Sequence, residues 1–143
     1  MPSKSTAERA RRDLRQGKRP TTAAGEFVHE EIEHVRRGKH GARSTRQAIA
    51  IGLSKARRAG VPLPPPKKGR AKSKTRQSAA RDYETGQGRR KPRAPSSTRS
   101  RATEGALKRE GRSAASRSAL SAHAKRAAAA RRHRRSDSHA SAT

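Results

Sequence analysis

The sequence predicts a mostly α-helical protein, in which a small two-helix hairpin with a short N-terminal helix precedes a largely disordered, basic Ala/Arg-rich tail. Three observations support this prediction. Two segments, roughly 22–37 and 44–59, repeat their apolar residues at helical spacing. Large apolar side chains are scarce, because Leu, Ile, Val and Phe supply only 12 of 143 residues. The remaining sequence is rich in Ala, Arg, Lys, Ser and Gly, a low-complexity composition typical of disorder.

Residues 1–21 are expected to form a basic N-terminal arm with one weak helix. Ser5 can cap the start of this helix and Glu8 can return the hydrogen bond, while Gly17 can end it. Leu14 is its single large apolar residue. We therefore expect this helix to need support from the segment that follows.

The first helix of the hairpin is predicted over residues 22–37. Its apolar residues recur at spacings of three and four, which places them on one stripe, and Gly38 is a plausible stop. Glutamates lie early and arginines late, the order that suits the helix dipole. Together with Phe27, which flanks the stripe, and two residues of the second helix, this stripe gives a predicted core of Phe27, Val28, Ile32, Val35, Ile49 and Leu53.

The second helix is predicted over residues 44–59, and residues 22–61 would form the hairpin domain. Ser44 and Gln47 make a capping box, and Gly60 follows the last turn. Gly52 lies on the predicted buried face, where the missing side chain would let a partner helix approach closely. Ile51 falls among basic residues, so we expect a third element, a ligand or a second copy in a homodimer to contact it.

A proline-rich linker, residues 62–70, is expected to be extended, because proline fixes its own φ and keeps the preceding residue out of the helical region. The tail, residues 71–143, would be disordered and polycationic. Two of its segments, 74–85 and 114–134, have good helix propensity from Ala and Arg. They have almost nothing to bury, so we expect them to gain helix only when phosphates neutralise them.

Several functional classes find no support in the sequence. There is no cysteine and no catalytic motif, so we expect neither an enzyme nor a cofactor. The sequence "HEEIEH" suggests a metal site at first sight, but His29 and His34 are five residues apart and would face different directions on a helix, so no metal is predicted. We find no signal peptide and no apolar run long enough for a membrane span, which favours a cytoplasmic protein.

The charge points to a polyanionic partner. Lys and Arg total 38 against 11 Asp and Glu, a formal net charge of +27, and such runs bind nucleic-acid phosphates with little sequence preference. We expect a nucleoid-associated or protective protein that binds duplex DNA non-specifically. The expected contact residues are Arg46, Lys55, Arg57, Arg58, Lys67, Lys68, Arg70, Lys72, Lys74, Arg76, Arg89, Arg90, Lys91, Arg93, Lys125, Arg126, Arg131, Arg132, Arg134 and Arg135.

Two other functions remain open. One is an RNA- or ribosome-associated role, although one Phe and one Tyr provide no stacking platform for single strands. The other is a protein-interaction adaptor, in which Ile51 and the acidic first helix would bind a protein while the tail supplies solubility.

The stretch from Gly25 to Val61 resembles a family of small, basic bacterial proteins defined only as a domain of unknown function. The pattern S-x-x-Q-A-I-A-I-x-L-S-x-A-R-x-A-G, matched from Ser44 to Gly60, bears the resemblance. It implies a bacterial source and no established activity. The tail is similar to linker-histone tails and to Ala/Lys/Arg-rich nucleoid proteins in composition only.

Overall fold

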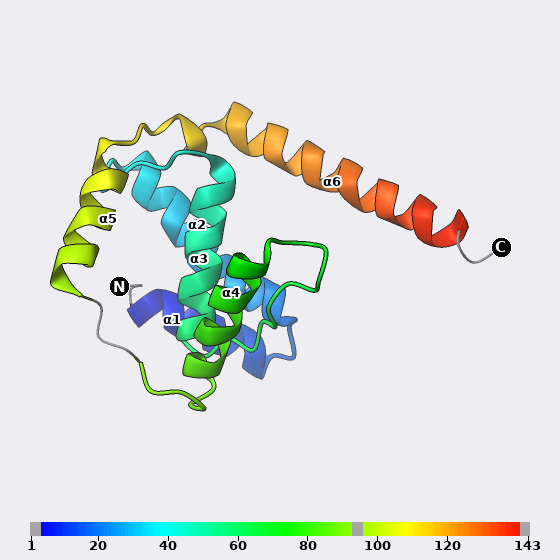
Figure 1. Ribbon diagram of the computed structural model, residues 1–143, viewed down its shortest axis with the longest axis horizontal. Coiled ribbons are helices and arrows are strands. Elements are labelled where there is room, and N and C mark those ends of the chain that lie inside the picture. Colours follow the sequence, from blue (N-terminus) through cyan, green and yellow to red (C-terminus); the bar gives the residue numbers. More distant parts are fainter. Residues whose placement is uncertain (1–3, 93–95, 141–143) are drawn as a thin grey trace.

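The protein is helical throughout the computed structural model, which describes residues 4–92 and 96–140 (Figure 1). Within these residues the chain forms six α-helices and one short 3₁₀ helix, and no strand. The predicted fold class, a small hairpin followed by a largely disordered tail, is therefore wrong, because the described residues of the tail form ordered helices. The elements are α1 (Lys4–Arg15), α2 (Pro20–Arg36), α3 (Thr45–Arg58), α4 (Ser73–Gly86), α5 (Ser97–Arg109), η1 (Ser113–Ala115) and α6 (Arg117–Ala140).

Helix α2 lies at the centre and packs against both α1 and α3. It begins at Pro20, where the missing N–H costs nothing because the first turn has no intrahelical acceptor. Ala10 of α1 and Phe27 of α2 join one buried cluster, which also includes Val61 after α3. Leu14 packs on this cluster from α1, so the weak first helix is supported by its neighbour as its sequence suggested.

Helix α3 packs closely against α2. Ser44 caps it, since its hydroxyl accepts from the Gln47 backbone N–H at 3.1 Å. The Gln47 side chain returns a bond to the N–H of Arg43, one residue earlier than a standard capping box. Gly52 faces the backbone of Val28, so the two helices approach at a distance that no side chain would permit.

Half of the predicted core residues are fully buried. Phe27, Ile32 and Val35 are inside the protein, and each belongs to a buried cluster. Val28 and Leu53 are half-buried and pack on these clusters. Ile49 and Ile51 are also half-buried. Much of the remaining interior is alanine, which explains how so few large apolar residues suffice.

The proline-rich linker does not separate the two halves in space. The buried guanidinium of Arg57 donates to the carbonyls of Leu63 and Pro64, at 3.1 and 3.2 Å, and fixes the path of the linker. The chain then turns back so that α4 packs against α3. At the far end of α4, Gly86 lies against the Arg57 carbonyl, where a Cβ atom would be 1.7 Å from that oxygen.

The opposite end of α2 and α3 holds the last third of the chain. Thr45 donates its hydroxyl proton to the Ala114 carbonyl, and Arg36 Nε donates to the Ala115 carbonyl at 3.0 Å. In the turn between α2 and α3, the N–H groups of Gly41 and Ala42 donate to carbonyls near the end of α5 at 2.8 and 3.0 Å. Both η1 and α6 contact α3.

These contacts explain why the tail is ordered. Ala79 of α4 is buried, as are Ala114 and Ala115 of η1, and Leu120 packs against the cluster that contains the two η1 alanines. Small side chains let the helices approach closely, and backbone hydrogen bonds complete the attachment. The expectation that segments 74–85 and 114–134 have almost nothing to bury counted large side chains alone, whereas the structure buries Ala79, Ala114 and Ala115.

Candidate nucleic-acid interface

Helix α6 projects from the body of the protein (Figure 1). Its first turn is anchored on η1 and α3, whereas every side chain from Ala129 to His139 is exposed. The helix contains seven Lys and Arg residues and one acidic residue, Asp137, which lies 3.3 Å from His133 Nε2. A helix that buries so little against its own chain presents nearly its whole surface to a partner.

The basic residues of α6 concentrate on one face. At about 100° per residue, Arg131, Arg132 and Arg135 fall within one arc of roughly 100°, with Lys125 beside them. These three arginines surround a shallow hollow at Ala128. Arg134 and Arg126 lie on other sides of the helix. We call Lys125, Arg131, Arg132 and Arg135 the α6 basic face; its like charges repel one another, and an anion would relieve that repulsion.

A cationic cleft lies where α3, α4 and the start of α5 meet. Two arginines of the helical body, Arg58 and Arg81, face the segment after α4 across it. The chief acidic group here is Asp82, whose carboxylate is 3.9 Å from Arg58 Nη1. The excess of positive charge in a concave surface is the arrangement expected to attract a phosphate. The cationic residues lining this cleft are Arg58, Arg81, Arg90, Lys91 and Arg99.

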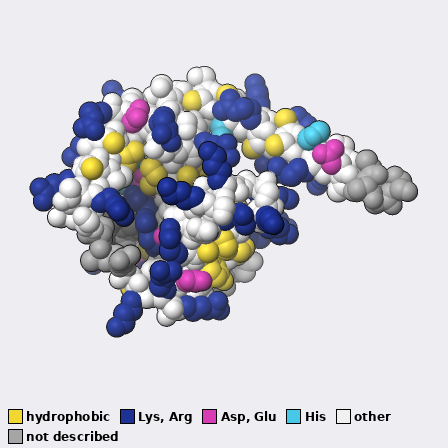
Figure 2. All heavy atoms as spheres, in the orientation of Figure 1, with side chains coloured by type: hydrophobic (Ala, Val, Ile, Leu, Met, Phe, Trp, Pro, Cys, Tyr) yellow, Lys and Arg dark blue, Asp and Glu magenta, His cyan; other side chains and the backbone are white. Residues whose placement is uncertain are grey.

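The other predicted contact residues are spread over the surface, and Figure 2 shows Lys and Arg side chains across the visible face and along α6. Lys72 and Lys74 line a hollow between α3 and α4. Arg126 lines another hollow with Arg43, where α6 leaves the body. Arg76 is half-buried. Arg93 lies outside the described residues. Exposed positions comprise Arg46, Lys67, Lys68, Arg70, Lys72, Lys74, Arg89, Arg90, Lys91, Lys125, Arg126, Arg131, Arg132, Arg134 and Arg135.

Lys55 and Arg57 are placed differently from the sequence-based expectation, because both turn inward. Lys55 forms an ion pair with the buried carboxylate of Glu31 on α2. Arg57 is 7% exposed and holds the linker carbonyls. Burial lowers the pKa of Arg57 from its ordinary value, and nearby Asp82 opposes this effect only in part. The guanidinium stays charged because arginine is not deprotonated in proteins. Of the four predicted contact residues on α3, Arg46 and Arg58 are exposed.

Two arginines of the cleft were not predicted as contact residues. Arg81 and Arg99 occur singly in the sequence, between polar and small residues, rather than in a basic run. The fold brings them beside Arg58, Arg90 and Lys91. Counting local charge density could not identify them, because the cleft is formed by segments that are distant in sequence.

Across the described part of the chain, every helix is too short or too polar to pass through a lipid bilayer.

Comparison with known proteins adds one match. Searches of curated proteins and of solved structures returned no similar protein. Residues 3–68 match a family whose description reads "Family of unknown function (DUF6496)". The matched region spans α1, α2, α3 and most of the linker, so it includes the helical body and excludes α4, α5 and α6. Within residues 3–68, therefore, this chain is similar to a family of unknown function.

Proposed function

We propose that this protein is a non-enzymatic, cytoplasmic nucleic-acid-binding protein that contacts the phosphate backbone of duplex DNA without sequence preference, as a nucleoid-associated protein does. The α6 basic face is the single observation that best supports this proposal. It combines four exposed cations on one side of a projecting helix, where the phosphates of a nucleic-acid backbone could contact them.

The cationic cleft supports the same function from a second part of the surface. Arg58, Arg81 and Arg99 line one concave site from three helices, and their guanidinium groups provide several N–H donors there. A polyanion in contact with both the cleft and α6 would release condensed counterions from each. The proposal therefore involves two separate cationic surfaces, rather than net charge alone.

The scarcity of accessible aromatic rings favours a duplex over a single strand. The sequence contains one Phe and one Tyr and no Trp. Phe27 is buried in the core and Tyr83 is half-buried on α4. Proteins that bind single strands usually stack bases on exposed aromatic rings, so backbone contact to a double helix is the better fit.

The proposal is tested by measuring the affinity of the full-length protein for duplex DNA over a range of salt concentrations. Phosphate contact predicts that log K falls linearly with log salt, with a slope of about −0.9 per phosphate neutralised. We expect a steep slope and similar affinities for unrelated sequences of equal length. Weak binding that is indifferent to salt would contradict the proposal.

Competition separates duplex DNA from the RNA alternative. At fixed salt, a structured RNA of equal charge should displace labelled duplex DNA less effectively than unlabelled duplex does. Preferential displacement by the RNA would assign the protein to the RNA- or ribosome-associated class. Tight, salt-insensitive binding of a protein partner would favour the adaptor function.

A further inference from the structure

A buried carboxylate lies in the helical body, away from the α6 basic face. Glu31 of α2 is 1% exposed, and it is one of the largest fully buried side chains. Its Oε1 atom pairs with the ammonium group of Lys55. Among the described residues, no donor gives its Oε2 atom a hydrogen bond of acceptable geometry. A buried carboxylate oxygen without a hydrogen bond is costly, so its surroundings need a physical explanation.

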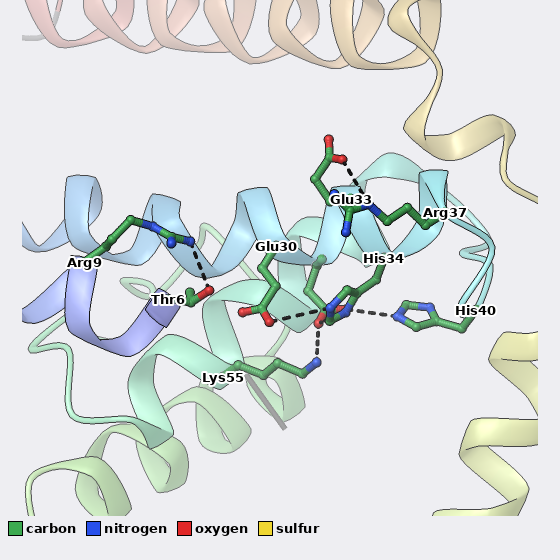
Figure 3. A network of polar contacts seen from close by, with 9 residues as sticks. Thr6, Arg9, Glu30, Glu33, His34, Arg37, His40 and Lys55 are labelled. Atoms are coloured by element: carbon green, nitrogen blue, oxygen red, sulfur yellow. Dashed lines mark hydrogen bonds and ion pairs between the residues drawn. The ribbon is translucent and has the colours of Figure 1, made fainter. Parts of the chain in front are cut away.

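Two imidazole rings lie beside this carboxylate. His34 is one helical turn after Glu31, and its Nδ1 is 3.5 Å from Glu31 Oε1. His40 lies in the turn after α2, with Nε2 3.2 Å from Glu31 Oε2. The positive φ of Gly38, +75°, reverses the chain there and places His40 next to the helix it has just left. Figure 3 shows His34, His40 and Lys55 converging from α2, the turn and α3.

The hydrogen bond of His40 Nδ1, the ring nitrogen that faces away from Glu31, determines the tautomer of His40. Nδ1 lies 2.8 Å from the Gly41 carbonyl, which can only accept, so Nδ1 must carry the proton. In the neutral ring, Nε2 then presents a lone pair toward Glu31 Oε2. Two lone pairs facing each other at 3.2 Å repel, unless a proton or a cation lies between them. A histidine that donates its outer N–H to a backbone carbonyl is the usual arrangement of a metal ligand.

His34 has a similar arrangement with a different outer partner. Its Nε2 lies 3.6 Å from Glu30 Oε1, and its Nδ1 faces Glu31. Burial lowers the pKa of His34, and this effect outweighs the opposing influence of Glu31 and Glu30.

We propose that Glu31, His34 and His40 bind one divalent transition-metal ion of the zinc class. Candidate ligand atoms of the three residues, one from each, all lie within 4.8 Å of one another. Ligands about 2.0–2.2 Å from a tetrahedral zinc are separated from each other by roughly 3.3–3.5 Å. The 3.2 Å between His40 Nε2 and Glu31 Oε2 already matches that spacing. His34 Nδ1 lies 3.5 Å from the other oxygen of the same carboxylate, so side-chain rotations that bring it toward Oε2 complete the site. The fourth position would hold water.

Lys55 affects how tightly this site binds its ion. Its ammonium group lies on Glu31 Oε1, so it leaves Oε2 for the metal. It also repels a second cation nearby. Lys55→Met removes this repulsion and frees Oε1, and it should therefore raise the metal affinity. If Glu31 served only as the partner of Lys55, the same change would destabilise the protein and leave zinc binding absent.

Metal binding would stabilise the contacts between the turn after α2 and the end of α5. His40 is followed directly by Gly41 and Ala42, whose N–H groups donate to Leu107 and Gly111 at 2.8 and 3.0 Å. An ion that fixes the position of His40 on α2 also restrains these two bonds. Zinc should therefore raise the melting temperature, without any nucleic acid present.

The experiment uses full-length protein stripped of metal with EDTA. Zinc titrated in a calorimeter should bind at one ion per chain. Cobalt(II) in place of zinc should give the intense visible absorption of a tetrahedral site, with no thiolate band because the chain has no cysteine. Absence of stoichiometric zinc binding by the folded protein would overturn the proposal.

Matched histidine variants assign the ligands. His34→Gln and His40→Gln should each weaken zinc binding by about 100-fold or more. Loss of a group that merely hydrogen-bonds to a metal ligand already costs about 10- to 100-fold in affinity. His29→Gln, on the exposed side of the same helix, should bind zinc as the wild type does. Equal weakening in all three variants would indicate adventitious surface binding and contradict the site.

Nitrogen NMR of the wild-type protein gives a readout that does not depend on the variants folding. On addition of zinc, the resonances of His40 Nε2 and His34 Nδ1 should shift as metal-bound nitrogens, while His40 Nδ1 stays protonated. His29 should keep its resonances. If the nitrogens of His34 and His40 do not change, the proposal fails.

Discussion

Gly52 of α3 lies directly against Val28 of α2, so that a Cβ atom at Gly52 would come within 2.7 Å of the Val28 Cα atom. Backbone cannot yield as a flexible side chain can, so Gly52→Ala must push the two helices apart. Overpacking of this kind typically costs about 1–3 kcal/mol. We expect urea denaturation to give a free energy of unfolding lower by that amount.

Gly25→Ala is the matched control on the facing helix. Gly25 is exposed within α2, and a Cβ atom there would have no neighbour within 4 Å. Alanine is favoured over glycine in a helix interior by about 1 kcal/mol, so this variant should be more stable than the wild type. If both substitutions change stability in the same direction, the close packing of α2 and α3 is wrong.

Arg57 and Arg58 are adjacent in sequence, and the structure assigns them different roles. Arg57→Met removes the bonds to the Leu63 and Pro64 carbonyls and leaves these acceptors without their donors. Hydrogen bonds from charged groups contribute about 1.5–3 kcal/mol each, so thermal unfolding should show a clear loss of stability. Because Arg57 is buried, the affinity of the folded variant for duplex DNA should change little.

Arg58→Met is the reciprocal control. Its side chain is exposed at the rim of the cationic cleft, and its pairing with Asp82 at 3.9 Å is weak. Stability should therefore stay within about 0.5 kcal/mol of the wild type, while DNA affinity falls. A loss of stability for Arg58→Met and not for Arg57→Met would contradict the description of the linker.

Thr45 anchors the segment that leads into α6. Thr45→Val keeps the size of the buried side chain and removes the hydroxyl that donates to Ala114. Loss of one buried partner costs about 1–3 kcal/mol. Limited proteolysis between α5 and α6 should therefore become faster. Thr22→Val, at an exposed position of α2, should leave the cleavage rate unchanged.

The helices of the body could be predicted from local signals. The apolar stripe over 22–37 and the capping box at Ser44 gave ends within two residues of α2 (Pro20–Arg36) and α3 (Thr45–Arg58). Gly52 was expected to permit a close approach, and it lies against Val28. Each of these signals depends on residues within a few turns of one another.

The ordered C-terminal half could not be predicted in this way. Thr45 and Ala114 are 69 residues apart, and Arg36 and Ala115 are 79 apart. The spacing of apolar residues along the sequence cannot predict a hydrogen bond between a side chain and a carbonyl that is distant in sequence. Alanines such as Ala79 were counted as helix formers, although they also provide the small buried surface on which α4 rests.

In the candidate sites, too, local signals could be predicted from the sequence and contacts between distant residues could not. The exposed arginines of α6 follow from local charge, whereas Lys55 and Arg57 have internal partners that lie on other elements. The metal prediction considered the pair His29 and His34 and found them misaligned. His40 was not considered with them, because only the turn at Gly38 brings it back to His34.

The most direct test of the proposed function compares two triple variants of equal charge in duplex-DNA binding. Arg131→Gln, Arg132→Gln and Arg135→Gln together neutralise most of the α6 basic face, while Arg11→Gln, Arg12→Gln and Arg15→Gln neutralise three exposed arginines of α1. We expect the α6 variant to lower the slope of log K against log salt by about 2 to 3, since each phosphate contact contributes about 0.9, and the α1 variant to change it far less. Equal effects of the two variants, or no effect of the α6 variant, would contradict a nucleic-acid interface on α6.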